Sequence, residues 1–281
     1  MRTIGLIDYY LDEWHANRYP AWIGQASGGR LKVAYAYGMK DADGGLSNAA
    51  WCERNGIKPL ASIEEVVDRS DGLVVLAPDH PELHERLALP CLRSGKPTYV
   101  DKTFAPDRRT AEALFEAARA HGTPLYSASA LRYAAEYAEA DKTDIEVLCS
   151  VGPGDYGNYA VHQLEPVVAL MGRRAKRLMY IGTPDAPALL IRFADGRQAT
   201  VHLLGRDCPF GIAVKRATGG TTVLKPESDY FQAFIRQLVA FFETGVPAVE
   251  PADTIAIVTL LEYGRIAARM PYEWIELPAP G

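Results

Sequence analysis

The sequence of 281 residues lacks several features that define whole classes of protein. Its four cysteines are far apart and form no C-x-x-C pair, so neither a disulfide framework nor a thiolate metal site is expected. No apolar run reaches the roughly 20 residues of a membrane span. The net charge of −5 comes without the basic stripe of a nucleic-acid binder. Met1 leads directly into an apolar strand, so no secretory leader is expected. These features predict a globular, cytoplasmic protein that binds neither nucleic acid nor a membrane.

Glycine is also scarce at one informative turn. The apolar run Ile4–Ile7 ends abruptly at an acid and leads into a polar, helix-like stretch, as in a nucleotide-binding βα unit. Such a unit carries G-x-G-x-x-G at the turn, because glycine lets backbone amides approach a pyrophosphate. Here the turn is occupied by Asp8, Tyr9, Tyr10 and Asp12, and no glycine follows Gly5 until Gly24. The turn therefore raises the question of what, if anything, it binds.

The first part of the chain alternates apolar runs with helical patterns. Five runs indicate strands: residues 3–7, 31–37, 72–77, 97–101 and 123–129. Helical patterns between them end at glycines or polar turns: residues 47–56, 62–70, 80–95 and 107–122. Such alternation is typical of βαβ units around a parallel sheet. We predict a Rossmann-like α/β domain over residues 1–128.

The pattern changes after Ser129. Two stretches resemble β-hairpins, with Asp195-Gly196 and Gly219-Gly220 at their turns, and two long helical patterns close the chain. Successive strands with flanking helices predict an α+β domain with a mostly antiparallel open sheet. We assign residues 129–281 to this second domain.

Three motifs in order resemble the Gfo/Idh/MocA oxidoreductase family. The first is "SGKPTYVDKTFAPD" (94–107), in which Asp101-Lys102-Thr103 stands where the family has Glu-Lys-Pro. The second is "NYAVHQLE" (158–165), which matches the family's D-x-G-x-H-x-x-D helix. The third is the closing segment, residues 228–268, which resembles the family's final helices. Together they cover nearly the whole chain.

The resemblance implies hydride transfer between NAD or NADP and a sugar-like or polyol hydroxyl. It also implies a substrate bound against the second domain's sheet, and a homo-oligomer. Two residues suit this chemistry. A neutral histidine such as His162 can accept the hydroxyl proton, since its ordinary pKa is about 6.5. The ammonium of Lys102 would stabilise negative charge developing on the oxygen.

Four departures from the family pattern concern mainly the residues that would bind the cofactor. The glycine turn is missing, and the second strand ends in Tyr37-Gly38 rather than in an acid that binds ribose hydroxyls. Thr103 replaces a proline, and Asn158 replaces the family's aspartate. Asn158 lies four residues before His162 and Glu165 three after it, which puts all three on one helix face. Asn158 would orient the imidazole, and Glu165 would balance its charge.

The candidate site residues follow from the resemblance and from these departures. For catalysis they are Lys102, His162, Glu165 and Asn158. For the cofactor they are Asp8, Tyr9, Tyr10, Pro78, Asp79, His80, Asp101 and Lys102. No metal site is expected, because the pair His80 and His84 has no third ligand nearby.

Three functions stay open at this point. The first is a dehydrogenase that holds its nicotinamide cofactor through contacts other than a glycine turn. The second is a non-redox enzyme that uses Lys102 and His162 for proton transfer on a carbohydrate. The third is a catalytically silent sugar or nucleotide sensor on the same fold.

Overall fold

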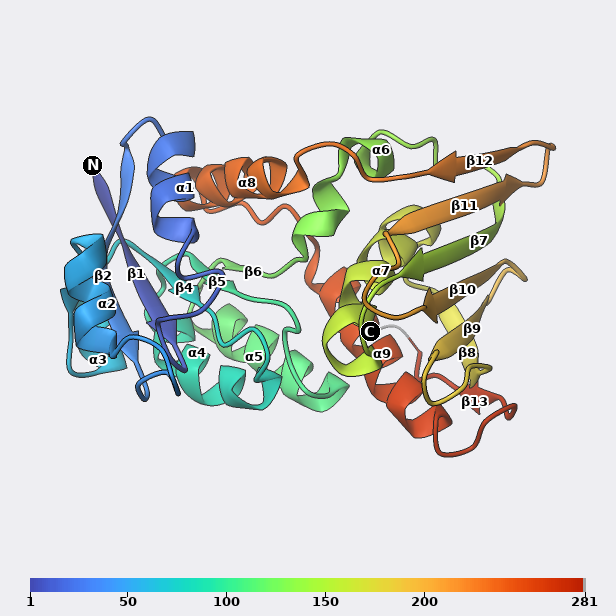
Figure 1. Cartoon of the computed structure of the whole chain (residues 1–281), viewed down its shortest axis with the longest axis horizontal. Coiled ribbons are helices and arrows are strands. Elements are labelled where there is room, and N and C mark those ends of the chain that lie inside the picture. Colours follow the sequence, from blue (N-terminus) through green and yellow to red (C-terminus); the bar gives the residue numbers. More distant parts are fainter. Residues whose placement is uncertain (280–281) are drawn as a thin grey trace. The chain divides into compact units, whose positions relative to one another are not determined.

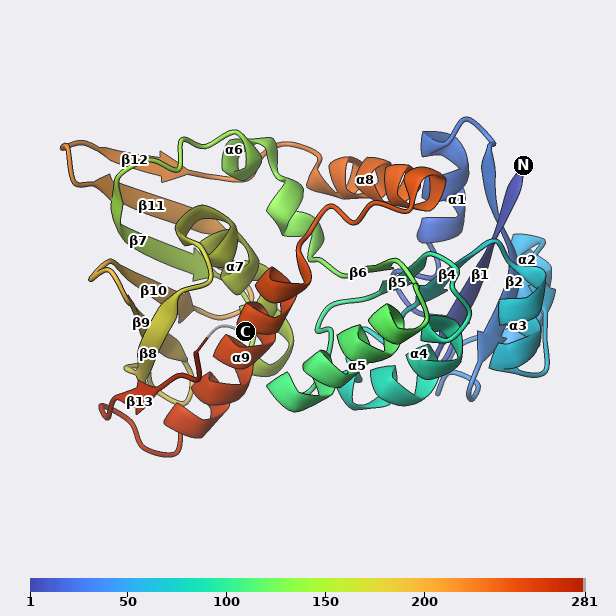
Figure 2. The same ribbon diagram turned by 180° about the vertical axis from the view of Figure 1, so that it is seen from behind.

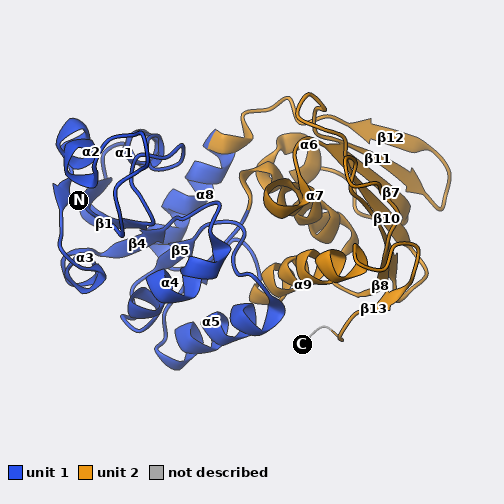
Figure 3. Ribbon diagram, turned by 60° about the horizontal axis from the view of Figure 1, so that its bottom comes forward, with its two compact units in different colours: residues 1–128, 232–250 blue, residues 129–231, 251–281 orange. Residues whose placement is uncertain are grey.

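The computed structural model describes residues 1–279, and the chain divides into two compact units. Unit 1 contains residues 1–128 and 232–250, and unit 2 contains residues 129–231 and the segment from Pro251 onward (Figure 3). The assignment of residues 129–281 to one domain is therefore corrected, since residues 232–250 belong with unit 1.

Unit 1 is built on a six-stranded parallel sheet with the order β3-β2-β1-β4-β5-β6 (Figure 1). Its strands are β1 (Arg2–Asp8), β2 (Leu31–Gly38), β3 (Lys58–Pro59), β4 (Gly72–Val75), β5 (Thr98–Val100) and β6 (Leu125–Tyr126). The chain runs outward from β1 in both directions, which is the doubly wound order of dinucleotide-binding folds. The carboxyl ends of β1 and β4 lie side by side, with Ile7 paired to Val75.

The helices of unit 1 begin where the sequence supplies a capping side chain. Ser47, Ser62 and Asp107 each accept a hydrogen bond from the backbone N–H three residues on, which fixes the starts of three helices. The helical elements are α1 (Tyr19–Ala26), α2 (Asn48–Asn55), α3 (Ile63–Arg69), η1 (Pro81–Leu83), α4 (His84–Leu92), α5 (Arg108–Ala120) and α8 (Tyr230–Thr244). Helices α4 and α5 run side by side next to the sheet (Figure 2).

The segment after β1 differs from the sequence prediction. The helix expected directly after Ile7 is absent, and residues 9–18 form a loop of bends and turns before α1 begins at Tyr19. We call residues 9–18 the β1–α1 loop. Asp12 and Asn48 tie this loop to the next βα connection. Asp12 Oδ2 accepts the Leu46 N–H at 2.8 Å, and Asn48 Oδ1 accepts the Leu11 N–H at 3.0 Å.

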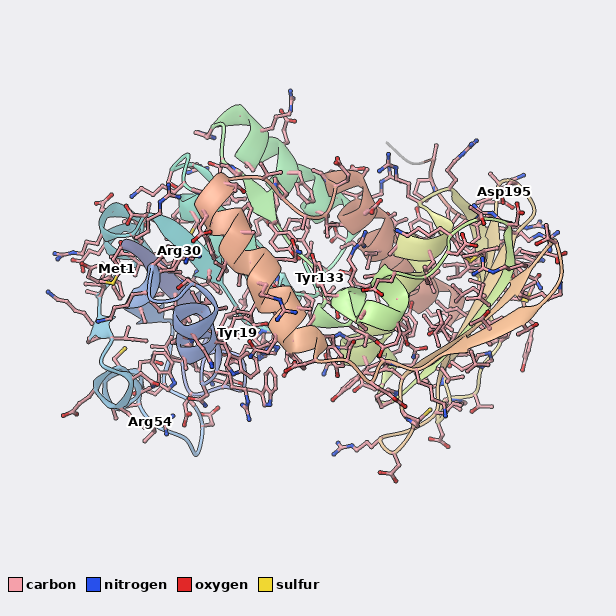
Figure 4. The ribbon with its side chains drawn as sticks, turned by 90° about the horizontal axis from the view of Figure 1, so that it is seen from above. Met1, Tyr19, Arg30, Arg54, Tyr133 and Asp195 are labelled. Atoms are coloured by element: carbon pink, nitrogen blue, oxygen red, sulfur yellow. The ribbon has the colours of Figure 1, made fainter. Side chains whose placement is uncertain are left out.

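Helix α8 packs in unit 1 through its aromatic face. The Phe234 ring lies 5.9 Å from the Tyr19 ring and 5.5 Å from the Tyr99 ring, and the Phe241 ring lies 5.3 Å from Tyr126 (Tyr19 is labelled in Figure 4). These rings are almost completely buried. The apolar area that they remove from water explains why α8 packs here, although its sequence follows the strands of unit 2.

Unit 2 holds a seven-stranded mixed sheet with the order β12-β11-β7-β10-β9-β8-β13. Its strands are β7 (Ile145–Gly152), β8 (Ala175–Tyr180), β9 (Ala188–Phe193), β10 (Gln198–Leu203), β11 (Gly211–Arg216), β12 (Thr221–Leu224) and β13 (Ile275–Glu276). Strands β7 and β10 pair in parallel, whereas the other pairs described in this sheet are antiparallel. Both predicted hairpins are present, as β9–β10 and β11–β12.

Four helical elements complete unit 2: η2 (Ala130–Tyr133), α6 (Ala135–Ala138), α7 (Tyr156–Met171) and α9 (Pro251–Ala267). Helices α7 and α9 contact each other and cover one face of the sheet. Strand residues alternate between buried and partly exposed, as in β10, which is expected when only one face is covered. A Rossmann-like parallel sheet followed by a mostly antiparallel sheet confirms the predicted fold class.

Within residues 1–279, no helix combines the length and apolar character that crossing a bilayer requires. The four cysteines are free thiols: Cys52 and Cys91 are buried, Cys208 is partly exposed and Cys149 is exposed.

Candidate functional site

A pocket of about 270 Å³ opens in unit 1 at the carboxyl ends of β1 and β4. In open α/β sheets, ligands bind outside the carboxyl ends of the strands, where the strand order reverses. The pocket is lined by Asp8, Tyr9, Tyr10, Asp12, Glu13, Trp14, His15, Ala77, Pro78, Asp79 and His80. Most of the residues predicted to bind a cofactor thus meet in one place.

Asp8 is buried at the end of β1 and joins the two strand ends. Its Oδ1 accepts the Tyr9 N–H at 2.7 Å and the Ala77 N–H at 2.9 Å. Its Oδ2 has no hydrogen-bond partner among the described residues. Burial and the nearby Glu13 carboxylate raise the pKa of Asp8 well above its ordinary value, which the two backbone bonds offset only in part. Asp8 therefore closes the turn rather than capping a helix.

The two tyrosines give the pocket an aromatic wall. The Tyr9 ring lies 4.7 Å from the His80 ring, edge to face, and 5.5 Å from the Tyr10 ring. Lys40 Nζ stands 5.1 Å from the centre of the Tyr9 ring and forms an ion pair with Asp43 at 2.8 Å. Aromatic faces of this kind can pack against a flat ring or a cation.

Glu13 and His15 also line this pocket, although the sequence did not single them out. Glu13 Oε2 accepts the His15 N–H at 2.8 Å and lies 3.0 Å from His15 Nδ1, and Glu13 Oε1 accepts the Ala16 N–H. Burial alone would lower the pKa of His15, but Asp101 and Glu13 outweigh it and raise that pKa. A carboxylate two residues before a histidine, in a loop that follows a strand, was the available signal.

Asp101 and Lys102 follow β5, the next strand of the sheet. Lys102 is only 8% exposed, and its Nζ donates to the carbonyl oxygen of Pro78 at 3.1 Å, which joins it to the pocket wall. The Tyr99 hydroxyl donates to Asp101 Oδ1 at 2.8 Å, while Asp101 Oδ2 has no partner in residues 1–279. The peptide between Lys102 and Thr103 is cis.

The pocket suits one part of a nicotinamide dinucleotide and not another. The Lys102 ammonium and the Tyr9 and His80 rings suit the polar groups and flat rings of such a cofactor. The β1–α1 loop does not suit its diphosphate, because Asp8, Asp12, Glu13 and Asp79 all line the pocket. Two like charges 4 Å apart repel by about 4 kcal/mol at an effective dielectric constant of 20. Any dinucleotide held here would need its diphosphate to avoid these carboxylates or to displace them.

The second group of predicted residues lies on α7 in unit 2. His162 Nδ1 lies 2.7 Å from Ser129 Oγ, and the His162 ring is flanked by Tyr159 at 5.7 Å and Phe210 at 6.0 Å. The imidazole is partly exposed. Its ring is therefore oriented by a serine from the start of unit 2, which no local sequence pattern connects with residue 162.

Glu165 is buried and bound on both oxygens. Its Oε1 accepts the Ser129 N–H at 2.8 Å, and its Oε2 pairs with Arg132 at 3.0 Å. Arg132 also contacts Asp253 at 2.9 Å. Burial raises the pKa of Glu165 despite the opposing charge of Arg132. The described contacts of Glu165 thus hold Ser129, which in turn contacts His162.

Asn158 lies at the exposed start of α7. Its backbone N–H donates to the capping carboxylate of Asp155 at 3.0 Å. Asn158, His162 and Glu165 share a helix, as predicted, but their exposure differs: Asn158 is exposed, His162 is partly buried and Glu165 is fully buried.

The two histidines near η1 are used separately. His80 Nδ1 lies 3.1 Å from Glu82, whereas His84 is buried with Nδ1 3.0 Å from the Phe104 carbonyl oxygen. Across residues 1–279, no three side chains of His, Cys, Asp or Glu are grouped so that they could hold a metal ion.

Comparison with known proteins identifies relatives of low sequence identity. No family model matches the chain. One curated protein, inositol 2-dehydrogenase 2 of Saccharopolyspora erythraea, is 29% identical over 94 residues. The aligned segment is 34% of this chain and 28% of the enzyme. The match therefore spans well under two thirds of the enzyme's length.

Solved structures match over nearly the full length. A probable dehydrogenase from Thermotoga maritima has a TM-score of 0.82 at 12% identity, covering 98% of each chain. Myo-inositol 2-dehydrogenase from Lactobacillus plantarum has a TM-score of 0.80 at 14% identity, covering 99% of each. The WlbA dehydrogenase from Bordetella pertussis, solved with NADH and UDP-GlcNAcA, has a TM-score of 0.77 at 14% identity, covering 98% of each.

These matches agree with the resemblance carried by the sequence motifs. They cover both units, so they concern the mixed sheet of unit 2 as well as the parallel sheet of unit 1. The chain therefore shares the two-domain fold of these dehydrogenases.

Proposed function

We propose that the protein is an NAD(P)-dependent oxidoreductase that acts on a sugar-like or polyol hydroxyl. The observation that carries this proposal is the buried ammonium of Lys102, which follows the parallel strand β5 and contacts the wall of the pocket in unit 1. The fold shared with inositol dehydrogenases and with a dehydrogenase solved with NADH supports the same reaction class.

Oxidation of an alcohol removes a hydride from carbon and a proton from oxygen. A bound nicotinamide supplies the acceptor for the hydride. His162 takes the hydroxyl proton on Nε2, in the tautomer whose Nδ1–H donates to Ser129 Oγ. Lys102 stabilises negative charge on the substrate oxygen as the proton leaves. Glu165 acts through Ser129 and is a positioning residue.

Three further features belong to the proposal. The substrate is a small carbohydrate-like molecule, as in the inositol and sugar-nucleotide dehydrogenases of similar fold. The partly exposed face of the sheet in unit 2 forms a homo-oligomer contact, which light scattering on the purified protein would test. A cytoplasmic location suits the free, exposed thiol of Cys149.

The test is turnover of a panel of inositols, sugars and sugar acids with NAD⁺ or NADP⁺, followed by absorbance of the reduced nicotinamide. Lys102→Ala and His162→Ala should each lower kcat by about 100-fold or more. Lys58→Ala and His121→Ala are matched controls, since both residues are exposed and lie outside the pocket. Unchanged turnover in either site variant would contradict the assigned roles.

The same panel separates the other two functions. A new isomer or eliminated water, detected by NMR without any nicotinamide, would favour non-redox proton transfer. Binding without conversion would favour a sensor.

A further inference from the structure

The β1–α1 loop carries backbone N–H groups to the place where a doubly wound sheet ordinarily binds a diphosphate. In such sheets, the turn after the first strand and the start of the following helix supply free N–H groups to the anion. In this chain, the N–H groups of the loop are largely engaged by other groups of the protein. Tyr9, Leu11, His15 and Ala16 each donate to a side-chain oxygen.

Glu13 is the residue that takes two neighbouring N–H groups at once. Its two carboxylate oxygens accept from His15 and Ala16, and the His15 imidazole adds a third contact at 3.0 Å. The Glu13 side chain is 8% exposed, so this anion is held inside the wall of the pocket. Adjacent backbone N–H groups together with an imidazole form an arrangement that suits a phosphate oxygen.

Asp8 is a second carboxyl group that accepts backbone N–H groups in this turn. It engages the N–H groups of Tyr9 and Ala77, which come from the ends of the two central strands. Asp8 lines the same pocket, and its Oδ2 is buried and has no partner in the described part of the chain. The turn therefore holds two internal carboxyl groups and leaves a buried polar atom without a partner in the described residues.

We propose that the Glu13 carboxylate is a built-in competitor for the diphosphate of a dinucleotide, and that it sets a weak affinity for that cofactor. The inference rests on the proposed function in so far as it concerns NAD(P). A diphosphate can reach the N–H groups of His15 and Ala16 only after Glu13 has turned away from them. Removal of the Glu13 charge should therefore strengthen the binding of phosphate-bearing ligands.

An ordinary structural role for Glu13 makes the opposite prediction. A carboxylate that only caps the turn before α1 would lower the stability of the loop when removed, without any gain in anion binding. The direction of the change in affinity therefore distinguishes a competitor from a cap.

The experiment is calorimetric titration of the full chain with NADH and, separately, with inorganic pyrophosphate. The variants are Glu13→Gln, which removes the charge and keeps one oxygen acceptor, and Glu13→Ala, which removes both. Glu116→Gln is the matched control, because it removes the same charge from the exposed pair with Arg119 on α5. Thermal unfolding of each variant shows whether it is folded.

We expect the Kd for NADH to fall about tenfold in Glu13→Gln, with detectable binding of pyrophosphate that the wild type and Glu116→Gln lack. If Glu13→Ala fails to fold, Glu13→Gln alone decides the result. Equal or weaker binding of both ligands by folded Glu13 variants would overturn the inference. The two proposals fail separately: pyrophosphate binding without NADH binding removes the dinucleotide function, whereas equal NADH binding by wild type and variants removes only the role of Glu13.

Discussion

Two buried carboxylates, Asp8 in unit 1 and Glu165 in unit 2, are held in different ways. Glu165 has both oxygens bound, one by the Ser129 N–H and one by the Arg132 guanidinium. Asp8 receives only two backbone N–H groups on one oxygen and has other carboxylates nearby. Removing a charge from water costs several kcal/mol unless the charge is paired. The two sites differ in how they compensate this desolvation. Glu165 is paired with a cation, whereas burial and the Glu13 carboxylate raise the pKa of Asp8 well above its ordinary value.

The difference also indicates which carboxylate belongs to the framework and which to a binding surface. A fully satisfied group such as Glu165 fixes one arrangement of the residues around it. A buried group with an unpartnered oxygen beside a pocket is more often found where a ligand or a proton is handled. Asp8 is a group of the second kind.

The largest loss of stability should come from removing Glu165, the carboxylate that is paired with Arg132. Glu165→Ala leaves the buried Arg132 with Asp253 as its remaining acidic partner, so the free energy of unfolding should fall by about 3 to 5 kcal/mol. Chemical denaturation of the variant measures this loss. Glu136→Ala is a control of the same residue type in unit 2, and its partly exposed contacts with Ser228 predict a much smaller loss. Equal losses of stability in Glu165→Ala and Glu136→Ala would show that the buried pair with Arg132 contributes no more than a partly exposed contact.

The unpaired site should respond differently to its two simplest substitutions. Asp8→Ala leaves the N–H groups of Tyr9 and Ala77 without their acceptor and should cost about 1 to 3 kcal/mol. Asp8→Asn keeps an oxygen for them and removes the charge, so at about pH 4 its stability should be close to that of the wild type. Denaturation curves of the two variants measure the gap between them. A loss in Asp8→Asn as large as in Asp8→Ala would mean that the charge itself stabilises the fold.

The dependence of stability on pH should follow from the raised pKa of Asp8. Below its ordinary pKa of 3.8, Asp8 is protonated in both folded and unfolded chains, and its contribution is fully present. As the pH rises above that value, the unfolded chain ionises first, so the free energy of unfolding falls until the folded pKa is passed. Each unit of raised pKa corresponds to about 1.4 kcal/mol. Denaturation of wild type and Asp8→Asn from about pH 4 to 8 should therefore show a difference that grows with pH. A constant difference would contradict the raised pKa.

The smallest effect concerns Ser129, which connects Glu165 with His162. Ser129→Ala keeps the N–H donated to Glu165 and removes the hydroxyl at His162, so stability should fall by about 1 kcal/mol or less. The proposed role in orienting His162 predicts a fall in kcat of about tenfold with little change in KM. Steady-state kinetics with the substrate identified from the panel provide the measurement, and Ser129→Thr, which keeps a hydroxyl, should restore most of the rate. No rescue would indicate that packing, rather than the hydroxyl, is responsible.

Much of the fold was predictable from the sequence, because local patterns carry it. The apolar runs at β1, β2 and β4 and the serine caps of α2 and α3 specify their elements within a few residues. The β1–α1 loop was not predictable, because its polar spacing resembles a helix, whereas side-chain bonds from Asp12, Glu13 and Asn48 hold it in turns. The bonds of Asp12 and Asn48 join residues 34 and 37 positions apart in the sequence.

The residues of the candidate site also differ in whether a local sequence motif identifies them. Lys102 and His162 could be singled out because each stands in a recognisable motif. Ser129 and Arg132 could not, because their contacts with α7 span about thirty residues and follow no periodicity. Whether the chosen residues act as assigned stays a prediction for the variants described above.

Helix α8 has a consequence for the order in which the chain matures during synthesis. Unit 1 needs Phe234 and Phe241 to cover Tyr19, Tyr99 and Tyr126, yet these phenylalanines are translated more than a hundred residues after the sheet is complete in sequence. Until then, the nascent sheet carries an uncovered aromatic surface, of the kind that chaperones bind. The first unit to emerge from the ribosome can therefore finish folding only after residues 129–231 of the second unit have also been synthesised.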